Sequence, residues 1–386
     1  MMDNIAGRKS SLSWAVNVTV FLLVVIWLIP TVGLFVSSFR DRDQIAVSAW
    51  WEAPFPVEQA YRARAEGTVT GGDGMWTITG NIFEVPGVAE DFGADRRPPI
   101  VAFGLRGINP GEFAAGAEVE NRDNGTTTVR ADGSFVFTTD ENPEEEGFPR
   151  VYFVAETPPD FTMANYDTVM TGDGMLQAFV NTLTVTIPAT VIPILIAAFA
   201  AYALAWMDFP GRGLLIAAVV GLLVVPLQLA LVPLLKLHQQ VGIGQSFVGI
   251  WLAHTGFGLP LAIYLLRNYM VGLPRDIIDS AKVDGATDFQ IFVRIILPLS
   301  FPALASFAIF QFLWTWNDLL VAKVFLPSND ESWVMTVRIA DDLLGSRGGD
   351  WGILAAAAFV SIAVPLLVFF TMQRYLVRGL LAGSVK

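Results

Sequence analysis

Cysteine is absent from the 386 residues, and histidine occurs only twice, at His238 and His254. Without thiols the chain can form no disulfide, no thiolate metal site and no cysteine nucleophile. Two histidines are too few for a histidine-based metal cluster. A phosphate-binding G-x-x-x-x-G-K-[ST] loop is also missing. We therefore expect no bound metal or cofactor, no catalytic residues and no enzymatic activity in this chain. If ATP drives its function, hydrolysis takes place in a partner.

Charged residues are scarce, because only 16% of the chain is Asp, Glu, Lys or Arg while 53% is hydrophobic. Such a composition is too apolar for an ordinary soluble protein. The net charge of −12 is concentrated, since residues 41–177 contain 24 acidic and 9 basic residues and leave a net charge of +3 on the rest. No basic patch interleaved with aromatic residues is present, so we expect no nucleic-acid partner.

Apolar runs point to a membrane as the solvent, since about 20 apolar residues cross a bilayer. The runs are 15–37, 178–206, 214–235, 247–266, 295–316 and 353–371. The first could be a cleaved signal peptide, but those carry only about 7–15 apolar residues before a small-residue cleavage site. Here Arg40, Asp41 and Arg42 follow instead. We expect an uncleaved span and six transmembrane helices in total.

Positive charges predict the orientation, because Lys and Arg are enriched in cytoplasmic loops. Arg8 and Lys9 precede the first span, which places the N-terminus in the cytoplasm. Six spans return the C-terminus to the same side. The loops predicted to be cytoplasmic, and the tail, carry Arg212, Arg267, Arg275, Lys282, Arg294, Arg374, Arg378 and Lys386.

Residues 42–177 are of a different composition, rich in Gly, Asp, Glu, Thr and Pro and without a membrane-length apolar run. Two pairs of alternating segments flank glycine-containing turns, and a further strand follows. The predicted strands are Thr68–Thr70, Met75–Thr79, Thr126–Val129, Ser134–Thr138 and Val151–Ala155. The pattern predicts an inserted, mainly-β domain of sandwich or barrel type on the outer face of the membrane.

An acidic run, Asp140–Glu146, lies inside this insert. Clustered carboxylates could bind calcium, but the run lacks the alternating ligand spacing and turn glycine of an EF-hand loop. A solvated loop is the favoured interpretation.

A polar island at 273–302 separates two apolar runs, and its sequence predicts two helices joined by a corner. Pro274 suits the start of the first helix, where its missing N–H costs nothing. Asp284-Gly285 ends that helix, because glycine adopts the left-handed conformation that a helix end requires. Thr287 and Gln290 form the pattern of a capping box and start the second helix.

The same island resembles the EAA loop of ABC-importer permeases of the carbohydrate (maltose/α-glucoside) type. The matching residues are Asp279-Ser280-Ala281, Asp284-Gly285-Ala286, Phe289 and Leu297-Pro298-Leu299. Asp279 and Ser280 depart from the family's Glu-Ala, which shortens the carboxylate by one methylene. An ordinary interfacial helix-turn-helix is the alternative. The resemblance implies an ATPase-coupling loop that contains Asp279, Ala281, Asp284, Gly285, Ala286 and Phe289.

The resemblance covers about 1–40 and 160–386 and implies a type I ABC-importer permease fold. The expected organisation is a cytoplasmic N-terminus and first span at 1–41, an insert at 42–177 and a five-helix core at 178–386. The implied partners are a second permease subunit, two copies of a cytoplasmic ATPase that binds ATP and Mg²⁺, and an extracytoplasmic sugar-binding protein. The implied location is the bacterial cytoplasmic (inner) membrane, in contact with lipid. The implied function is import of a carbohydrate, an oligosaccharide or glucoside.

Several polar and aromatic side chains within the spans are candidates for a substrate pathway. His254 is ionisable, and an intramembrane ionisable group marks function by default, although a neutral imidazole bonded to a neighbouring helix is the favoured alternative. Phe310, Trp314 and Asn317 share one helical face that suits a sugar, but an interfacial belt containing Trp314 and Trp316 is the favoured interpretation of the aromatics. Gln228 and Gln311 are expected to bond between helices.

Two other classes of protein remain as alternatives. A secondary transporter would show inverted repeats and coupling-ion ligands in its spans, and the sequence has neither. An adhesion or sensor protein that acts through its outer β domain would need one membrane anchor rather than six spans.

Overall fold

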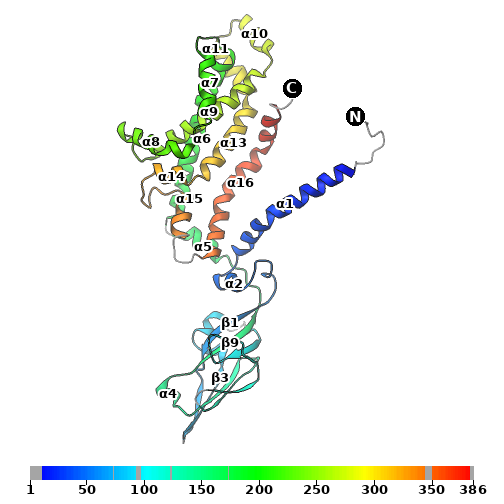
Figure 1. Cartoon of the computed structure of the whole chain (residues 1–386), viewed down its shortest axis with the longest axis vertical. Helices are drawn as coiled ribbons and strands as arrows, with labels where there is room; N and C mark the ends of the chain where they lie inside the picture. Colours follow the sequence, from blue (N-terminus) through cyan, green and yellow to red (C-terminus); the bar gives the residue numbers. More distant parts are fainter. Residues whose placement is uncertain are drawn as a thin grey trace. The chain divides into compact units, whose positions relative to one another are not determined.

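The fold was obtained as a computed structural model that describes residues 11–72, 74–92, 97–121, 124–172, 174–343 and 350–382 (Figure 1). Arg8, Lys9 and Lys386, which contribute to the predicted orientation, lie outside the described residues. The chain forms two compact units, Met1–Thr162 and Met163–Lys386.

The first unit begins with α1 (Ser11–Ser37), an uncharged helix whose side chains are almost all exposed within this unit. Its length and hydropathy suit a membrane span. The short helix α2 (Arg42–Val47) follows and starts at Asp41, whose carboxylate accepts a hydrogen bond from the Arg42 N–H. The chain then enters a β domain.

Two antiparallel sheets make up this domain. One has the strand order β1-β9-β4-β5 and the other β2-β3-β8-β7-β6. The strands are β1 (Val57–Arg64), β2 (Thr68–Gly72), β3 (Met75–Asn81), β4 (Ile100–Gly104), β5 (Phe113–Ala114), β6 (Glu118–Glu120), β7 (Thr126–Val129), β8 (Ser134–Thr139) and β9 (Arg150–Thr157). Between them lie the 3₁₀ turn Ile82–Glu84, α3 (Val88–Phe92) and α4 (Pro143–Glu146).

Both sheets contribute side chains to one apolar core, which makes the domain a β-sandwich. Phe103 and Phe153 from the first sheet and Ile78, Phe135 and Phe137 from the second are buried in it. The predicted hairpins are confirmed by the registers of β2 with β3 and of β7 with β8. In the acidic run the structure forms α4, because Pro143 suits a first helical turn and Asn142 caps it.

All the secondary-structure elements in the described residues of the second unit are helices or helical turns. Its elements are α5 (Ala164–Thr171), α6 (Met175–Trp206), α7 (Arg212–Leu222), α8 (Leu227–Gln240), α9 (Phe247–Val271), α10 (Arg275–Val283), α11 (Asp288–Ile291), a π turn (Phe292–Ile296), α12 (Leu297–Leu299), α13 (Phe301–Trp316), α14 (Leu320–Phe325), α15 (Met335–Arg338), a second π turn (Ile339–Leu343) and α16 (Trp351–Ala382). Helix α6 packs along α9 and α13, and α13 packs along α16.

Prolines bend two of the six predicted spans. The run at 214–235 forms α7 and α8, which meet at 108° because Pro226 adopts an extended conformation between them. The run at 295–316 forms the α11–α12 segment and α13, which meet at 69° beside Ser300 and Pro302. Four described helices are long and apolar enough to cross a membrane, and six spans result only if each bent pair counts as one.

The boundary between the two compact units lies at Thr162–Met163, earlier than the predicted end of the insert at 177. Helix α5 belongs to the second unit because its buried Val169 packs with Met175 and Ala178 at the start of α6. The last part of the predicted insert therefore includes α5, a short helix that belongs to the second unit.

Candidate functional site

The corner between α10 and α11 is a glycine-terminated helix end with complete backbone hydrogen bonding. Gly285 has φ +82°, the left-handed conformation predicted for it. Its N–H donates to the Lys282 carbonyl at 3.0 Å, and the Ala286 N–H donates to the Ala281 carbonyl at 3.0 Å. This pair of bonds is the Schellman motif, which fixes the direction in which the chain leaves the helix.

The next helix starts at the predicted capping box. The Thr287 N–H donates to Gln290 Oε1 at 2.9 Å, and the Gln290 N–H donates to Thr287 Oγ1 at 3.3 Å. The helix then continues through the π turn into α12 and toward Pro298. Both ends of the corner are therefore held by local bonds, and the corner is a defined shape rather than an open loop.

Burial divides the six predicted coupling residues into two groups. Ala281 and Ala286 pack against the core of the helical unit. Asp279, Asp284, Gly285 and Phe289 are exposed, with Phe289 at 65%. Val283, which the sequence analysis did not single out, is 88% exposed. Val283 is an apolar residue that lies off the stripe of Ile277, Ile278 and Ala281 and directly before the Asp-Gly pair, and this combination was the available signal.

Helix α10 is anchored to the bundle by its apolar face. Ile278 is 2% exposed and joins a cluster that includes Leu266 and Met270 of α9. The polar face carries a long ion pair between Arg275 Nε and Asp279 Oδ2 at 3.6 Å, and both side chains are largely exposed. Such a surface pair contributes little to stability, so burial of Ile278 is the main attachment.

A second candidate cluster lies inside the bundle around His254. This residue is fully buried on α9, and the Trp314 ring from α13 lies edge-on to it with centroids 5.4 Å apart. Asp318, which follows α13, approaches it with 3.8 Å between Oδ2 and His254 Nε2. Asp318 is distant from His254 in the sequence, so this approach was not predicted. Asp318 adjoins the predicted Asn317, and that adjacency was the only sequence signal for it.

The remaining pathway candidates differ in how exposed their side chains are and in what those side chains contact. Phe310 is 53% exposed and Asn317, at the end of α13, is also exposed. Trp316 is 1% exposed and donates a hydrogen bond to the Ser361 carbonyl at 2.9 Å, so it cannot belong to an interfacial belt. Gln311 bonds to the Ala189 carbonyl of α6 as predicted, at 3.2 Å. Gln228 is instead exposed on α8.

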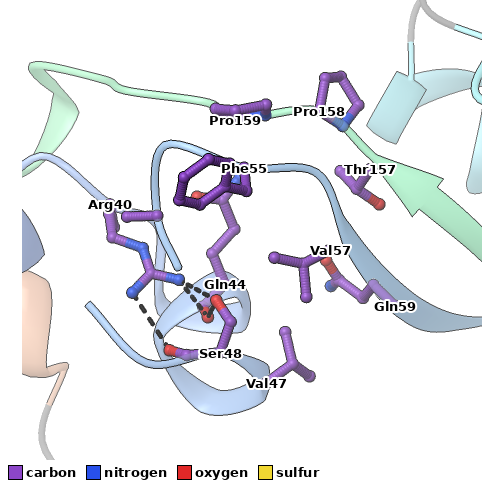
Figure 2. Close-up of a pocket in the computed structure, with 11 residues that line it drawn as sticks. Arg40, Gln44, Val47, Ser48, Phe55, Val57, Gln59, Thr157, Pro158 and Pro159 are labelled. Atoms are coloured by element: carbon purple, nitrogen blue, oxygen red, sulfur yellow. Dashed lines mark hydrogen bonds between the residues drawn. The ribbon is translucent and has the colours of Figure 1, made fainter. Parts of the chain in front are cut away.

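A buried arginine organises the corner between α1 and the β-sandwich (Figure 2). Arg40 is 2% exposed, and its guanidinium donates to the Gln44 and Ser48 carbonyls and to Ser48 Oγ. Burial lowers the pKa of this guanidinium, and the Glu52 carboxylate partly raises it again. Arg40 lines a small pocket. Val57 and Gln59 from β1 and Thr157 from β9 line the side of this pocket opposite Arg40, as Figure 2 shows. The bonds hold Arg40 against α2 and its C-cap residue Ser48, in the segment that joins the first span to β1.

No group of three or more His, Cys, Asp or Glu side chains within the described ranges is arranged to hold a metal ion. The two candidate clusters of the second unit are the exposed corner of Gly285 and the polar cluster of His254.

Comparison with known proteins matches the same region. The family model described as "Binding-protein-dependent transport system inner membrane component" matches residues 170–381, which include both clusters. The alpha-glucoside transport system permease protein AglG of Rhizobium meliloti is 56% identical over 387 residues, which cover 98% of this chain and 99% of that protein.

Two further relatives match a shorter part of the chain. The osmoprotective compounds uptake permease protein GgtD of Synechocystis is 58% identical over 58% of this chain and 76% of its own length. The trehalose transport system permease protein SugB of Mycobacterium tuberculosis is 36% identical over 59% of this chain and 84% of its own length. The chain belongs to the family of binding-protein-dependent transport system inner membrane components.

Proposed function

We propose that this chain is one transmembrane subunit of an ATP-driven importer that moves a carbohydrate, an oligosaccharide or glucoside, across the bacterial cytoplasmic membrane. The α-glucoside relative supports this substrate class because its similarity extends over nearly the full chain, including the β-sandwich region. The trehalose relative supports it over the shorter match. The chain itself performs translocation, and a partner hydrolyses ATP.

The partners proposed are a second permease subunit, two copies of a cytoplasmic ATPase that holds ATP and Mg²⁺, and an extracytoplasmic sugar-binding protein. The family description supports the binding protein in general terms. The sequence has no phosphate-binding loop of its own, which supports a separate ATPase.

The exposed Gly285 corner is the observation that carries the coupling role. An ideal Cβ built on Gly285 meets no atom of this chain within 4 Å, so the surface there is open to a partner. Val283 and Phe289 flank it as exposed apolar side chains, which suit the buried centre of an interface. Closure of the ATPases would press on this corner. Since Ile278 is packed into the bundle, the displacement would pass to α9 and reorient the spans.

The orientation proposed has both termini and the Gly285 corner in the cytoplasm and the β-sandwich outside. It requires six crossings, two of them made by the bent pairs α7–α8 and α11–α13. Phe310 and Asn317 are proposed to line the substrate pathway, with Trp314 between them in sequence. His254 is buried behind Trp314, so its role there is to support the ring rather than to touch sugar.

Reconstitution tests this function directly. The complete complex in liposomes should take up an α-glucoside such as maltose only when ATP, Mg²⁺ and the binding protein are all supplied. Uptake driven by an ion gradient without ATP would instead identify a secondary transporter and overturn the proposal.

A further inference from the structure

A small polar cavity lies within the second unit, between α6, α9 and the turn that follows α13. Its polar lining consists of Thr182, Thr186, His254, Thr315 and Asp318. The rest of the lining is apolar. Three separate parts of the chain thus direct polar groups into one hollow in an otherwise hydrophobic bundle.

Most of these groups lack a partner from the protein. Neither ring nitrogen of His254 has a hydrogen-bond partner among the described residues, although the side chain is fully buried. The buried hydroxyls of Thr186 and Thr315 also have no hydrogen-bond partner within the described part of the chain. Nearly all buried polar groups in proteins are hydrogen-bonded to protein or to ordered water, so several unsatisfied groups around one cavity indicate a shared small ligand.

The distance between the two ionisable groups indicates the size of that ligand. His254 Nε2 and Asp318 Oδ2 are 3.8 Å apart, which is too long for a direct hydrogen bond. Polar atoms at such a separation are commonly bridged by water. The cavity has room for about one water molecule, and no sugar ring could enter it. A metal ion is disfavoured because no cluster of three ligating side chains exists among the residues described.

We propose that this cavity is an internal water site in which ordered water hydrogen-bonds His254, Asp318, Thr186 and Thr315. The Asp318 carboxylate also accepts a hydrogen bond from the Ala322 N–H at the start of α14, at 3.1 Å. Water bonded to the same carboxylate therefore connects α9 to the junction of α13 and α14. The connection fixes the turn that carries Asn317, and it is independent of which solute the protein transports.

A high-resolution cryo-EM map of the assembled complex in nanodiscs tests the site without any substitution. We expect a density peak within about 2.6–3.2 Å of both His254 Nε2 and Asp318 Oδ2. A map in which the two side chains contact each other directly, or in which the cavity contains no peak at water-resolving quality, would overturn the proposal.

The direction in which a Thr186 variant changes the stability of the complex supplies a second test. Thr186→Val keeps the side-chain shape and removes the hydroxyl. If the hydroxyl bonds to water, its loss should lower the thermal midpoint of the complex by about 2–4 °C, the usual shift for one lost interaction in a unit of this size. If the hydroxyl is unsatisfied, the same change should leave the midpoint unchanged or raise it, and the water site is then wrong.

Thr184→Val is the matched control. Thr184 lies on the same helix, is exposed, and donates its hydroxyl to the Val180 carbonyl at 2.8 Å. Thr184→Val therefore measures the stability that is lost when a threonine hydroxyl is removed from α6 outside the cavity. The proposal requires the Thr186 variant to lose more stability than this control.

Discussion

At the scale of the residue, Gly285 combines a positive φ with open space around its Cα, and these two features separate two effects of substitution. Gly285→Ala should cost about 1 kcal/mol of local stability, because a Cβ disfavours positive φ. An ideal Cβ at Gly285 meets no atom of this chain within 4 Å, so a defect of Gly285→Trp larger than that of Gly285→Ala points to a partner surface. We expect Gly285→Trp to release the ATPase or to uncouple ATP hydrolysis from uptake, measured by co-purification and by the ratio of sugar transported to ATP hydrolysed.

Gly242→Trp provides the control for that experiment. Gly242 has φ +80°, is exposed, and likewise has no atom within 4 Å of an ideal Cβ. In the proposed orientation it lies on the opposite side of the membrane from the ATPase. Equal loss of coupling in both variants would attribute the effect to backbone strain and remove the argument for a joint at Gly285.

The exposed end of α13 leads to a prediction about substrate. Phe310 and Asn317 are exposed, and the Asn317 side-chain amide donates only to the Leu313 carbonyl among its described contacts, at 2.9 Å. Asn317→Ala and Trp314→Ala should therefore change the preference among maltose, sucrose and trehalose by several-fold while the complex still assembles. Competition uptake assays measure the preference. Unchanged preference in both variants would limit these side chains to packing.

Residue-level predictions succeeded where the cause is local. The conformation of Gly285 and the Thr287–Gln290 capping box follow from a few adjacent residues, and the structure confirms both. The approach of Asp318 to His254 depends on how α9 and α13 pack, which no local pattern encodes. Burial of Trp316 was missed for the same reason, because an aromatic near the end of a span suits both a lipid interface and a helix contact.

At the scale of the element, the capping box should control the rigidity of the coupling corner. Thr287→Ala removes the side chain that holds the Gln290 N–H and should cost about 1 kcal/mol. Amide hydrogen exchange in α11 should then be about 5-fold faster, which hydrogen–deuterium mass spectrometry of the complex can measure. Thr287→Ser, which keeps the hydroxyl, should exchange as the unmodified protein does. Equal acceleration in both variants would show that the box does not hold the corner.

Element bends were harder to predict than element positions. The apolar runs placed α6 and α9 within a few residues of their observed ends, because hydropathy reports burial in lipid or protein directly. The run at 353–371 located the start of α16 but ended well before Ala382, where that helix ends. Pro226 and Pro302 were visible in the sequence, but proline in a transmembrane helix can be tolerated when neighbours satisfy the freed backbone groups. Whether a proline bends a span by 108° or stays inside it, as Pro260 does in α9, depends on the packing around it.

At the scale of the whole molecule, the proposed orientation can be measured with reporters active only outside the cytoplasm. Insertion at Gly147 should give activity, since this glycine lies at the exposed end of α4 and has no atom near an ideal Cβ. Insertion at Gly285 should give none. The reverse pattern would place the Gly285 corner outside and remove any contact with a cytoplasmic ATPase.

The division of the chain into a β-sandwich and a helical unit could be predicted because the two parts differ in composition, charge and apolar run length. The boundary at Thr162–Met163 could not, because α5 is too short and too polar to stand out from a loop. Its assignment to the helical unit comes from Val169, which is buried in a cluster with Met175 and Ala178 of α6 and with Ala356 and Ala357 of α16.

The absence of cysteine from this chain makes the proposed contact with the ATPase testable by crosslinking without background from native cysteines of this subunit. Val283→Cys places a thiol at an 88% exposed position beside Gly285, where the substitution disturbs no packing. With single cysteines introduced across the ATPase surface, we expect a crosslink whose yield changes when ATP is added, because ATP-driven closure would move that surface relative to the corner. Val241→Cys, at a 61% exposed position beyond α8, should form none. If Val283→Cys crosslinks no ATPase position while the complex transports normally, the coupling surface lies elsewhere on the chain.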